Sequence, residues 1–423
     1  MSRSHKNHLL DNDNRVICRP SHPRSGRGQE ARRSVVVWRR AVRPLGKLRN
    51  QGMTSTVSKD LTISLDAMGG DQAPGIVIEG VELVLQKHPD VRFLLFGDEA
   101  ALAPLLRVHS GAAAACEVRH TPERVSMADK PSQVLRRGRN SSMGLAISSI
   151  KEGQAHAMVS AGNTGGLMAL AMYVLSTMKG IDRPAIAVLW PKTEGRCVFL
   201  DMGANVAATA KQLADFAILG VAFAHVALGK KNPTVALLNV GAEELKGHES
   251  VRDAAAILKD PSLGLNFVGF TEGSDIPFDG ADVVVTDGFT GNVALKTAEG
   301  TARFIAFFMK RAFNGSVLAR LGAVLARSAF GALRGLLDTN AQNGGVFLGL
   351  NGIVVKSHGS ADGRGFASAI DMAIDLAHSN FAEDIAESVK RLNVELAKSD
   401  GDVMSSGKQE HQLSDANREI AAQ

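Results

Sequence analysis

Cysteine and aromatic residues are both scarce in this sequence. Cys18, Cys116 and Cys197 are the only cysteines among 423 residues, and no two of them lie at a CxxC spacing. An odd and sparse set excludes a disulfide framework and is typical of reduced thiols in a cytoplasm. Aromatic residues make up 5% of the chain and apolar residues 45%, a balance that favours tightly packed α/β layers over a β-sandwich.

Long apolar runs and the motifs of common enzyme classes are missing too. An apolar run of about 18 residues is needed to span a bilayer, and candidates such as Met168–Leu175 are far shorter, so we expect a cytoplasmic protein. There is no GxxxxGK[ST] motif, no GxGxxG after a predicted strand, no GxSxG and no HExxH. P-loop, dinucleotide, serine-hydrolase and zinc-peptidase chemistry are therefore unsupported, and we expect no cofactor and no metal.

Positive charge is concentrated at the N-terminus. The net charge is +5, but residues 1–52 hold 13 Lys and Arg against three Asp and Glu, which leaves the other residues at −5. This distribution gives no case for nucleic-acid binding. Residues 1–52 lack periodicity and are interpreted as a disordered basic extension, with a transit-type leader as the alternative and Met53 as a candidate translation start. Residues 400–423 are interpreted as a polar tail.

From residue 61 onward, short apolar runs alternate with glycine-rich loops and helical segments. This alternation predicts a three-layer α/β/α, Rossmann-like fold with a mostly parallel sheet covered on both faces. Pro184–Trp190 and the run that follows it, joined by Lys192–Gly195, predict one antiparallel hairpin. The other strands are predicted at Leu61–Leu65, His156–Val159, Cys197–Leu200, Thr234–Leu238, Val283–Val285 and Ile353–Val355.

A glycine-rich loop follows each of six predicted strands. Right-handed crossovers place the loops after parallel strands at one edge of a sheet, so we expect all six to converge there. Loops that enter helices offer backbone N–H groups and the positive end of the helix dipole, which suits phosphate. Because tight turns need glycine for geometry alone, this interpretation depends on the whole set of loops.

Five segments carry an identification. Together, and in this order, they resemble the bacterial phosphate acyltransferases of phospholipid synthesis over about residues 61–395. The segments are Ile63–Asp71 followed by Ala73 and Pro74, Ser160–Gly165, Asp201–Asn205, Asp287–Asn292 and Lys356–Gly359.

The resemblance implies a homodimer with a fold similar to those of isocitrate dehydrogenase and phosphotransacetylase. It implies that acyl carrier protein donates an acyl group to inorganic phosphate, and that a membrane-embedded acyltransferase uses the acyl phosphate to acylate glycerol 3-phosphate. Roles of individual residues are inferred from chemistry instead.

Three basic side chains are candidates for holding phosphate at the catalytic site. Lys296 lies one turn into the helix after the Asp287–Asn292 loop, and its alternative is a solvated helix lysine. Lys356 and His358 project to one side of the last predicted strand, so both could reach one ligand, although a loop histidine is often structural. Asn205 and Asn292 are counted as catalytic because each could donate to an oxyanion; helix capping is the alternative.

The other candidates are assigned to substrate binding through the loops that contain them. Asp66 would repel phosphate, so we expect it to fix its loop by accepting backbone N–H bonds, or to take a proton. The set is Asp66, Gly69, Gly70, Gly162, Asn163, Thr164, Gly165, Gly203, Gly291, Ser357 and Gly359.

Two basic surfaces are candidates for partner contacts. Arg136, Arg137 and Arg139 form the densest basic cluster of the globular part and are predicted to dock acidic acyl carrier protein, with a solvated charged face as the alternative. Residues 303–337 are predicted to form a helical hairpin with a break at residues 314–316. Its second helix carries an arginine stripe at residues 320, 327 and 334, which suits an anionic membrane surface or a dimer bundle.

Three alternative functions stay open at this stage. A phosphotransacetylase-like enzyme that uses acyl-CoA shares both fold and chemistry. A non-catalytic phosphate-binding module would bind phosphate without acyl transfer. A dehydrogenase is suggested only by the fold and lacks the dinucleotide motif.

Overall fold

The computed structural model describes residues 61–278, 280–327, 344–379, 381, 383, 385–387, 389 and 390. Every described residue belongs to one unit, which lies within residues 45–423. The predicted extension at residues 1–52 and the predicted tail at residues 400–423 lie outside the described residues.

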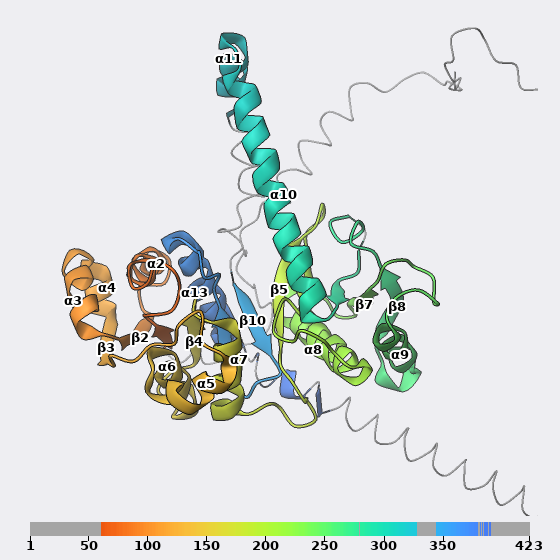
Figure 1. Cartoon of the computed structure of the whole chain (residues 1–423), viewed down its shortest axis with the longest axis horizontal. Coiled ribbons are helices and arrows are strands. Elements are labelled where there is room, and N and C mark those ends of the chain that lie inside the picture. The colour runs from red at the N-terminus through yellow and green to blue at the C-terminus, as the bar shows by residue number, and fades with distance from the viewer. Residues whose placement is uncertain are drawn as a thin grey trace, which may run out of the picture. The chain divides into compact units, whose positions relative to one another are not determined.

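The described residues form an α/β fold built on one sheet (Figure 1). The strands are β1 Thr62–Asp66, β2 Arg92–Gly97, β3 Cys116–His120, β4 Ala157–Ser160, β5 Ala185–Pro191, β6 Arg196–Leu200, β7 Thr234–Leu238, β8 Asn266–Thr271, β9 Val283–Val285, β10 Gly345–Leu348 and β11 Ile353–Lys356. The α-helices are α2 Gly75–Leu85, α3 Glu99–Val108, α4 Ser110–Ala115, α5 Pro131–Arg137, α6 Ser142–Lys151, α7 Thr164–Leu175, α8 Ala210–Leu228, α9 Glu249–Leu258, α10 Gly288–Asn314, α11 Val317–Leu325 and α13 Gly363–His378. All seven strands named from the sequence are present.

Antiparallel pairs in the middle of the sheet reverse its direction. The strand order is β3-β2-β1-β4-β11-β10-β5-β6-β9-β7-β8. β10 is antiparallel to both β11 and β5, and β5 forms the predicted antiparallel hairpin with β6. β9, β7 and β8 then continue parallel to β6, so this half runs opposite to β1, β4 and β11.

This reversal contradicts the expectation that six loops converge at one edge. The loops after β1, β4 and β11 share one edge, whereas those after β6, β7 and β9 leave the sheet in the opposite direction. The expectation was wrong because it treated the sheet as continuously parallel beyond the hairpin.

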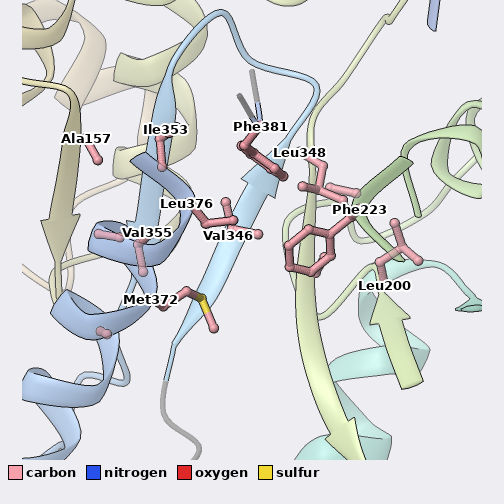
Figure 2. Packing of buried hydrophobic residues seen from close by; sticks show 14 of the residues in the cluster. Ala157, Leu200, Phe223, Val346, Leu348, Ile353, Val355, Met372, Leu376 and Phe381 are labelled. Atoms are coloured by element: carbon pink, nitrogen blue, oxygen red, sulfur yellow. The ribbon is translucent and has the colours of Figure 1, made fainter. Parts of the chain in front are cut away.

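Apolar side chains cover both faces of the sheet, because successive strand residues point to opposite sides. On β11, Ile353 and Val355 belong to one buried cluster and Val354 belongs to the other. Figure 2 shows the first cluster, in which Met372 and Leu376 of α13 pack toward the strand residues of β10 and β11. Helices on both faces complete the three layers.

Helix α8 is a long apolar helix that a search for uninterrupted apolar runs does not find. Ala210–Leu228 is long enough, and with a mean hydropathy of 1.4 apolar enough, to cross a membrane by length and composition. The interruption by Lys211 and Asp215 hid it in a search for uninterrupted runs. Because 61% of its apolar window is buried inside the protein, α8 is a core helix here.

Two glycines of α10 give a matched test of its packing. A Cβ at Gly291 would lie 2.0 Å from the carbonyl oxygen of Asp201, whereas one at Gly300 would meet nothing within 4 Å. We expect Gly291→Ala to lower the free energy of unfolding by about 1–3 kcal/mol through overpacking. Gly300→Ala should raise it by about 0.5–1 kcal/mol, because alanine favours the helix. Urea unfolding measures both, and equal effects would contradict this packing.

Candidate active site

The ends of β1, β4 and β11 bring a buried carboxylate and a lysine together. The strand register places Leu65 beside Val159 and Ser160 beside Lys356. Asp66, at the end of β1, is 1% exposed. Its carboxylate accepts hydrogen bonds from the hydroxyls of Ser142 and Ser160, both at 2.6 Å. These bonds connect the end of β1 to the start of α6 and to the end of β4. Burial raises the pKa of Asp66, while the two serines and Lys356 oppose that shift.

Lys356 is held with its ammonium group aimed at backbone carbonyls. Its Nζ donates to the carbonyl oxygen of Ala161 at 3.3 Å and to that of Ser357. Burial lowers the pKa of Lys356 to about 8; Asp66 acts against the shift and the nearby Lys296 adds to it. A lysine in this state keeps its proton at neutral pH and loses it as the pH rises through about 8, and an anion beside it favours the charged form.

His358 and Lys296 meet although 62 residues separate them. The Lys296 ammonium contacts His358 Nε2, and Glu299 Oε2 accepts from the same ammonium at 2.9 Å. On the other side of the ring, Nδ1 accepts from the backbone N–H of Ser360 at 3.3 Å and lies 2.9 Å from the Ser360 hydroxyl. Burial and Lys296 lower the pKa of His358, so the ring is neutral at neutral pH.

Sequence reasoning missed Glu299 and Ser360. Glu299 is 15% exposed in its side chain and lies one helical turn beyond Lys296, where an i,i+3 ion pair is expected. Ser360 follows His358 by two residues. Spacing within a helix was a signal for Glu299, whereas only the loop's conformation brings Ser360 to the ring.

The glycines of these loops allow close approach of backbone to backbone. A Cβ at Gly69 would lie 2.4 Å from Asp66 Oδ2 and 2.8 Å from the nitrogen of Gly162. Gly70 has φ of +107°, a conformation that side chains rarely adopt. The carbonyl oxygen of Gly359 accepts from the backbone N–H of Asp71 at 2.9 Å, so the β1 and β11 loops are joined.

The predicted residues at the start of α7 position a neighbouring loop. Asn163 caps the helix by accepting from Gly166 N at 2.9 Å. Its amide nitrogen donates to the carbonyls of Met127 and Asp129, both at 2.9 Å. Thr164 and Gly165 follow in the first turn of the helix.

Ser357, which follows β11, is buried, and its backbone N–H donates to the carbonyl oxygen of Ser160 at 2.9 Å.

Asn205 belongs to a second cluster, at the end of β6. The fully buried Asp201 accepts from four backbone N–H groups and from the Asn205 amide at 2.8 Å. The other contacts of Asn205 are the carbonyl of Pro184 at 2.8 Å and the guanidinium of Arg183 at 2.6 Å. These contacts use both amide hydrogens of Asn205, which favours a positioning role.

The first turns of α10 connect the two clusters. Gly288 N donates to the carbonyl oxygen of Asn205 at 2.7 Å. Asn292 is exposed, with its Cβ 3.6 Å from the position a Cβ would take on Gly203, which has φ of +121°. Lys296 lies one turn farther along α10, at His358. The helix therefore carries Lys296 from the edge where β9 ends to the edge where β11 ends.

The three predicted docking arginines lie at the end of α5. Arg136 and Arg137 are exposed in its last turn, and Arg139 follows in a 3₁₀ turn. The Arg139 guanidinium lies 4.2 Å from the centre of the Tyr173 ring, a cation–π contact. The loop before α5 is the one that Asn163 holds.

The chemistry of this cluster suits an anion. Lys296, Lys356 and His358 present cationic or N–H groups at one sheet edge, next to loops that enter helices. Among the described residues, no group of three or more His, Cys, Asp and Glu side chains is arranged to hold a metal ion.

Comparison with known proteins identifies relatives of the whole α/β unit. Residues 61–384 match the family described as Fatty acid synthesis protein. The chain is 50% identical over 338 residues to a phosphate acyltransferase of Rhodospirillum rubrum, covering 80% of this chain and 97% of the relative. It is 52% identical over 341 residues to a phosphate acyltransferase of Caulobacter vibrioides, covering 81% and 95%.

A phosphotransacetylase structure from Streptococcus pyogenes has the same fold. It superposes with a TM-score of 0.51 at 18% identity and covers 76% of this chain and 95% of its own.

The two asparagines give a test that separates positioning from direct contact. Asn205→Ala removes a buried amide and with it one hydrogen bond each to Asp201, Arg183 and the carbonyl of Pro184, so we expect it to lower the free energy of unfolding by about 1–3 kcal/mol. Asn292→Ala removes an exposed side chain and should change stability by less than about 0.5 kcal/mol. Thermal unfolding measures both. A stable Asn205→Ala protein would refute the positioning role.

Proposed function

Since the chain belongs to the phosphate acyltransferase family, we propose that it transfers a long-chain acyl group from acyl carrier protein to inorganic phosphate. The acyl phosphate then supplies acylation of glycerol 3-phosphate in phospholipid synthesis. The observation that carries the proposal is the convergence of Lys296, Lys356 and His358 from two distant segments. We also propose that residues 61–395 form the catalytic unit and that the enzyme acts in the cytoplasm.

The reaction requires positioning more than it requires a protein nucleophile. A phosphate oxygen attacks the thioester carbonyl carbon and forms the new C–O bond. The tetrahedral oxyanion collapses, the C–S bond breaks, and the carrier thiolate leaves and is protonated by solvent. A thiol pKa of about 8.5 makes this departure easy. Holding the phosphate dianion and stabilising the oxyanion are the tasks left to the protein.

Each basic residue receives a role from its surroundings. Lys356 and Lys296 bind phosphate, and the anion favours the protonated form of Lys356, which burial disfavours. The neutral His358 ring contacts the Lys296 ammonium through Nε2 and fixes its direction. Asn292, exposed beside Gly203, is retained as an oxyanion donor. Asn205 and Asp66 hold loops instead of contacting substrate.

The helical segment supports two further proposals. Phe304, Phe307 and Phe308 of α10 are 64%, 61% and 47% exposed, and Leu318 of α11 is 81% exposed. We propose that this surface mediates a homodimer and contact with an anionic membrane near the glycerol-3-phosphate acyltransferase. α10 ends at the predicted break, Arg320 and Arg327 are described, and Arg334 lies outside the described residues. Light scattering tests the dimer and vesicle co-sedimentation tests the membrane contact.

Removing either lysine should weaken the use of phosphate. Charge-assisted hydrogen bonds contribute about 1.5–3 kcal/mol, so Lys296→Ala and Lys356→Ala should each lower kcat/KM for phosphate about tenfold to hundredfold. Lys310→Ala, on the exposed surface of the same helix, is the control. Initial rates at varied phosphate measure the effect. Wild-type phosphate dependence in both lysine variants would show that the assignment is wrong.

The lowered pKa of Lys356 predicts a pH dependence. With a pKa of about 8, the free enzyme loses this cation as the pH rises through that value, so kcat/KM for phosphate should fall above about pH 8. Lys356→Arg keeps its charge at these pH values and should lose that fall. If wild type and Lys356→Arg share one profile up to pH 9, another group controls the reaction.

The carrier and its coenzyme A alternative are separated by comparing donors. We expect phosphate-dependent thiol release from long-chain acyl-acyl carrier protein, and a steep loss when Arg136, Arg137 and Arg139 are all changed to Glu, because the carrier is acidic. Release from acyl-CoA should change much less, since acyl-CoA makes no protein–protein contact. Equal losses with both donors would contradict docking at α5. Efficient use of acyl-CoA alone would favour the phosphotransacetylase-like alternative.

A further inference from the structure

Three exposed apolar side chains cluster where α10 begins. Val206 is 80% exposed, Phe289 is 64% exposed and Val293 is 50% exposed. Gly288 N donates a 2.7 Å hydrogen bond to the carbonyl oxygen of Asn205. Val206 follows Asn205 in the chain and Phe289 follows Gly288, so this bond brings Val206 and Phe289 close together. Val293 lies one turn beyond Phe289 on the helix. Together these side chains form an apolar patch, named here the α10 patch.

The α10 patch is continuous with the candidate active site. Phe289 and Lys296 are seven residues apart, so they project from the same side of the helix about 10.5 Å apart along its axis. Val293 lies between them. A ligand that reaches from Phe289 along this stripe arrives at the Lys296 ammonium and the His358 ring.

We infer that the α10 patch binds the hydrocarbon chain of the acyl substrate. This inference rests on the proposed function, in which the acyl carbonyl meets phosphate beside Lys296. The chain attached to that carbonyl has to leave the site along some surface, and the stripe from Val293 to Phe289 is apolar. The family match, to a fatty acid synthesis protein, indicates a hydrocarbon chain as the occupant.

The other side of the site suits the carrier end of the thioester. A Cβ at Gly359 would lie 3.3 Å from the Met127 side chain, so the loop that contains Met127 borders the residue next to His358. This loop leads directly into α5 and the docking arginines. The carrier arm therefore approaches from α5, and the acyl chain extends from the reacting carbon toward the α10 patch. Each methylene that the patch covers should strengthen binding about threefold to fourfold.

Direct binding of a fatty acid tests the patch without catalysis. The probe is cis-parinaric acid, whose fluorescence rises in apolar surroundings, titrated into the full-length protein. We expect the double variant Phe289→Ser, Val293→Ser to bind it about tenfold more weakly than wild type. Val268→Ser is the matched control, because Val268 is 54% exposed on β8, outside the patch. Equal affinities of wild type and the double variant would overturn the inference.

Turnover distinguishes this inference from the proposed function. With palmitoyl and butyryl thioesters as substrates, the double variant should lower the ratio of kcat/KM for palmitoyl over butyryl about tenfold. An unchanged ratio in an active enzyme overturns the α10 patch and leaves the proposed function standing. Acyl transfer to phosphate that is absent in wild type overturns the function, while the parinaric acid titration still decides the patch. A double variant that loses a dimer by light scattering shows a second copy of the chain as occupant, which also overturns the inference.

Discussion

The reversal of strand direction at β10, β5 and β6 is the constraint on which the site depends. It sends the loops after β6 and β9 away from the edge where β1, β4 and β11 end. α10 overcomes that separation, because it starts against the Asp201 loop and extends until Lys296 touches His358. The glycines at its start permit this path: a Cβ at Gly288 or Gly291 would collide with the backbone of Asn205 or Asp201. Two strand ends and one helix therefore meet at a single cluster of basic side chains.

Buried charge keeps the site responsive to its ligand. Asp66 accepts hydrogen bonds from two serine hydroxyls, so it fixes the loops and only partly neutralises the Lys356 ammonium group. Burial of Lys356, with Lys296 nearby, lowers the pKa of Lys356 to about 8. In the proposed function, a phosphate dianion pairs with both ammonium groups and so favours the charged form of Lys356.

Much of the fold could be predicted from the sequence, because an apolar run followed by a glycine-rich loop predicts a buried strand. β1, β4, β7, β9 and β11 and the β5–β6 hairpin were found this way. β3 carries Glu117 and Arg119 at the sheet edge and gives no clear apolar signal. β10 is apolar, but it leads into β11 and not into a helix, so it falls outside the strand, glycine loop and helix pattern. The predicted hairpin already reverses β6 relative to β5, but the sequence analysis did not extend that reversal to the strands that follow, so it missed the division of the six loops between two edges. Lys296, Lys356 and His358 were named from local motifs, but Glu299 and Ser360 depend on contacts that spacing alone could not show. Asn205 looked like a free donor because its partners, Pro184 and Arg183, lie 21 and 22 residues away in the chain.

The central claim is that phosphate itself attacks the acyl group, with the protein as its holder. The most direct measurement is a single turnover of enzyme with radiolabelled acyl-acyl carrier protein, in the presence and absence of phosphate. The account predicts thiol release and labelled acyl phosphate only when phosphate is present, and no label on the denatured protein. One equivalent of thiol released without phosphate, with the label bound covalently to the protein, would contradict it.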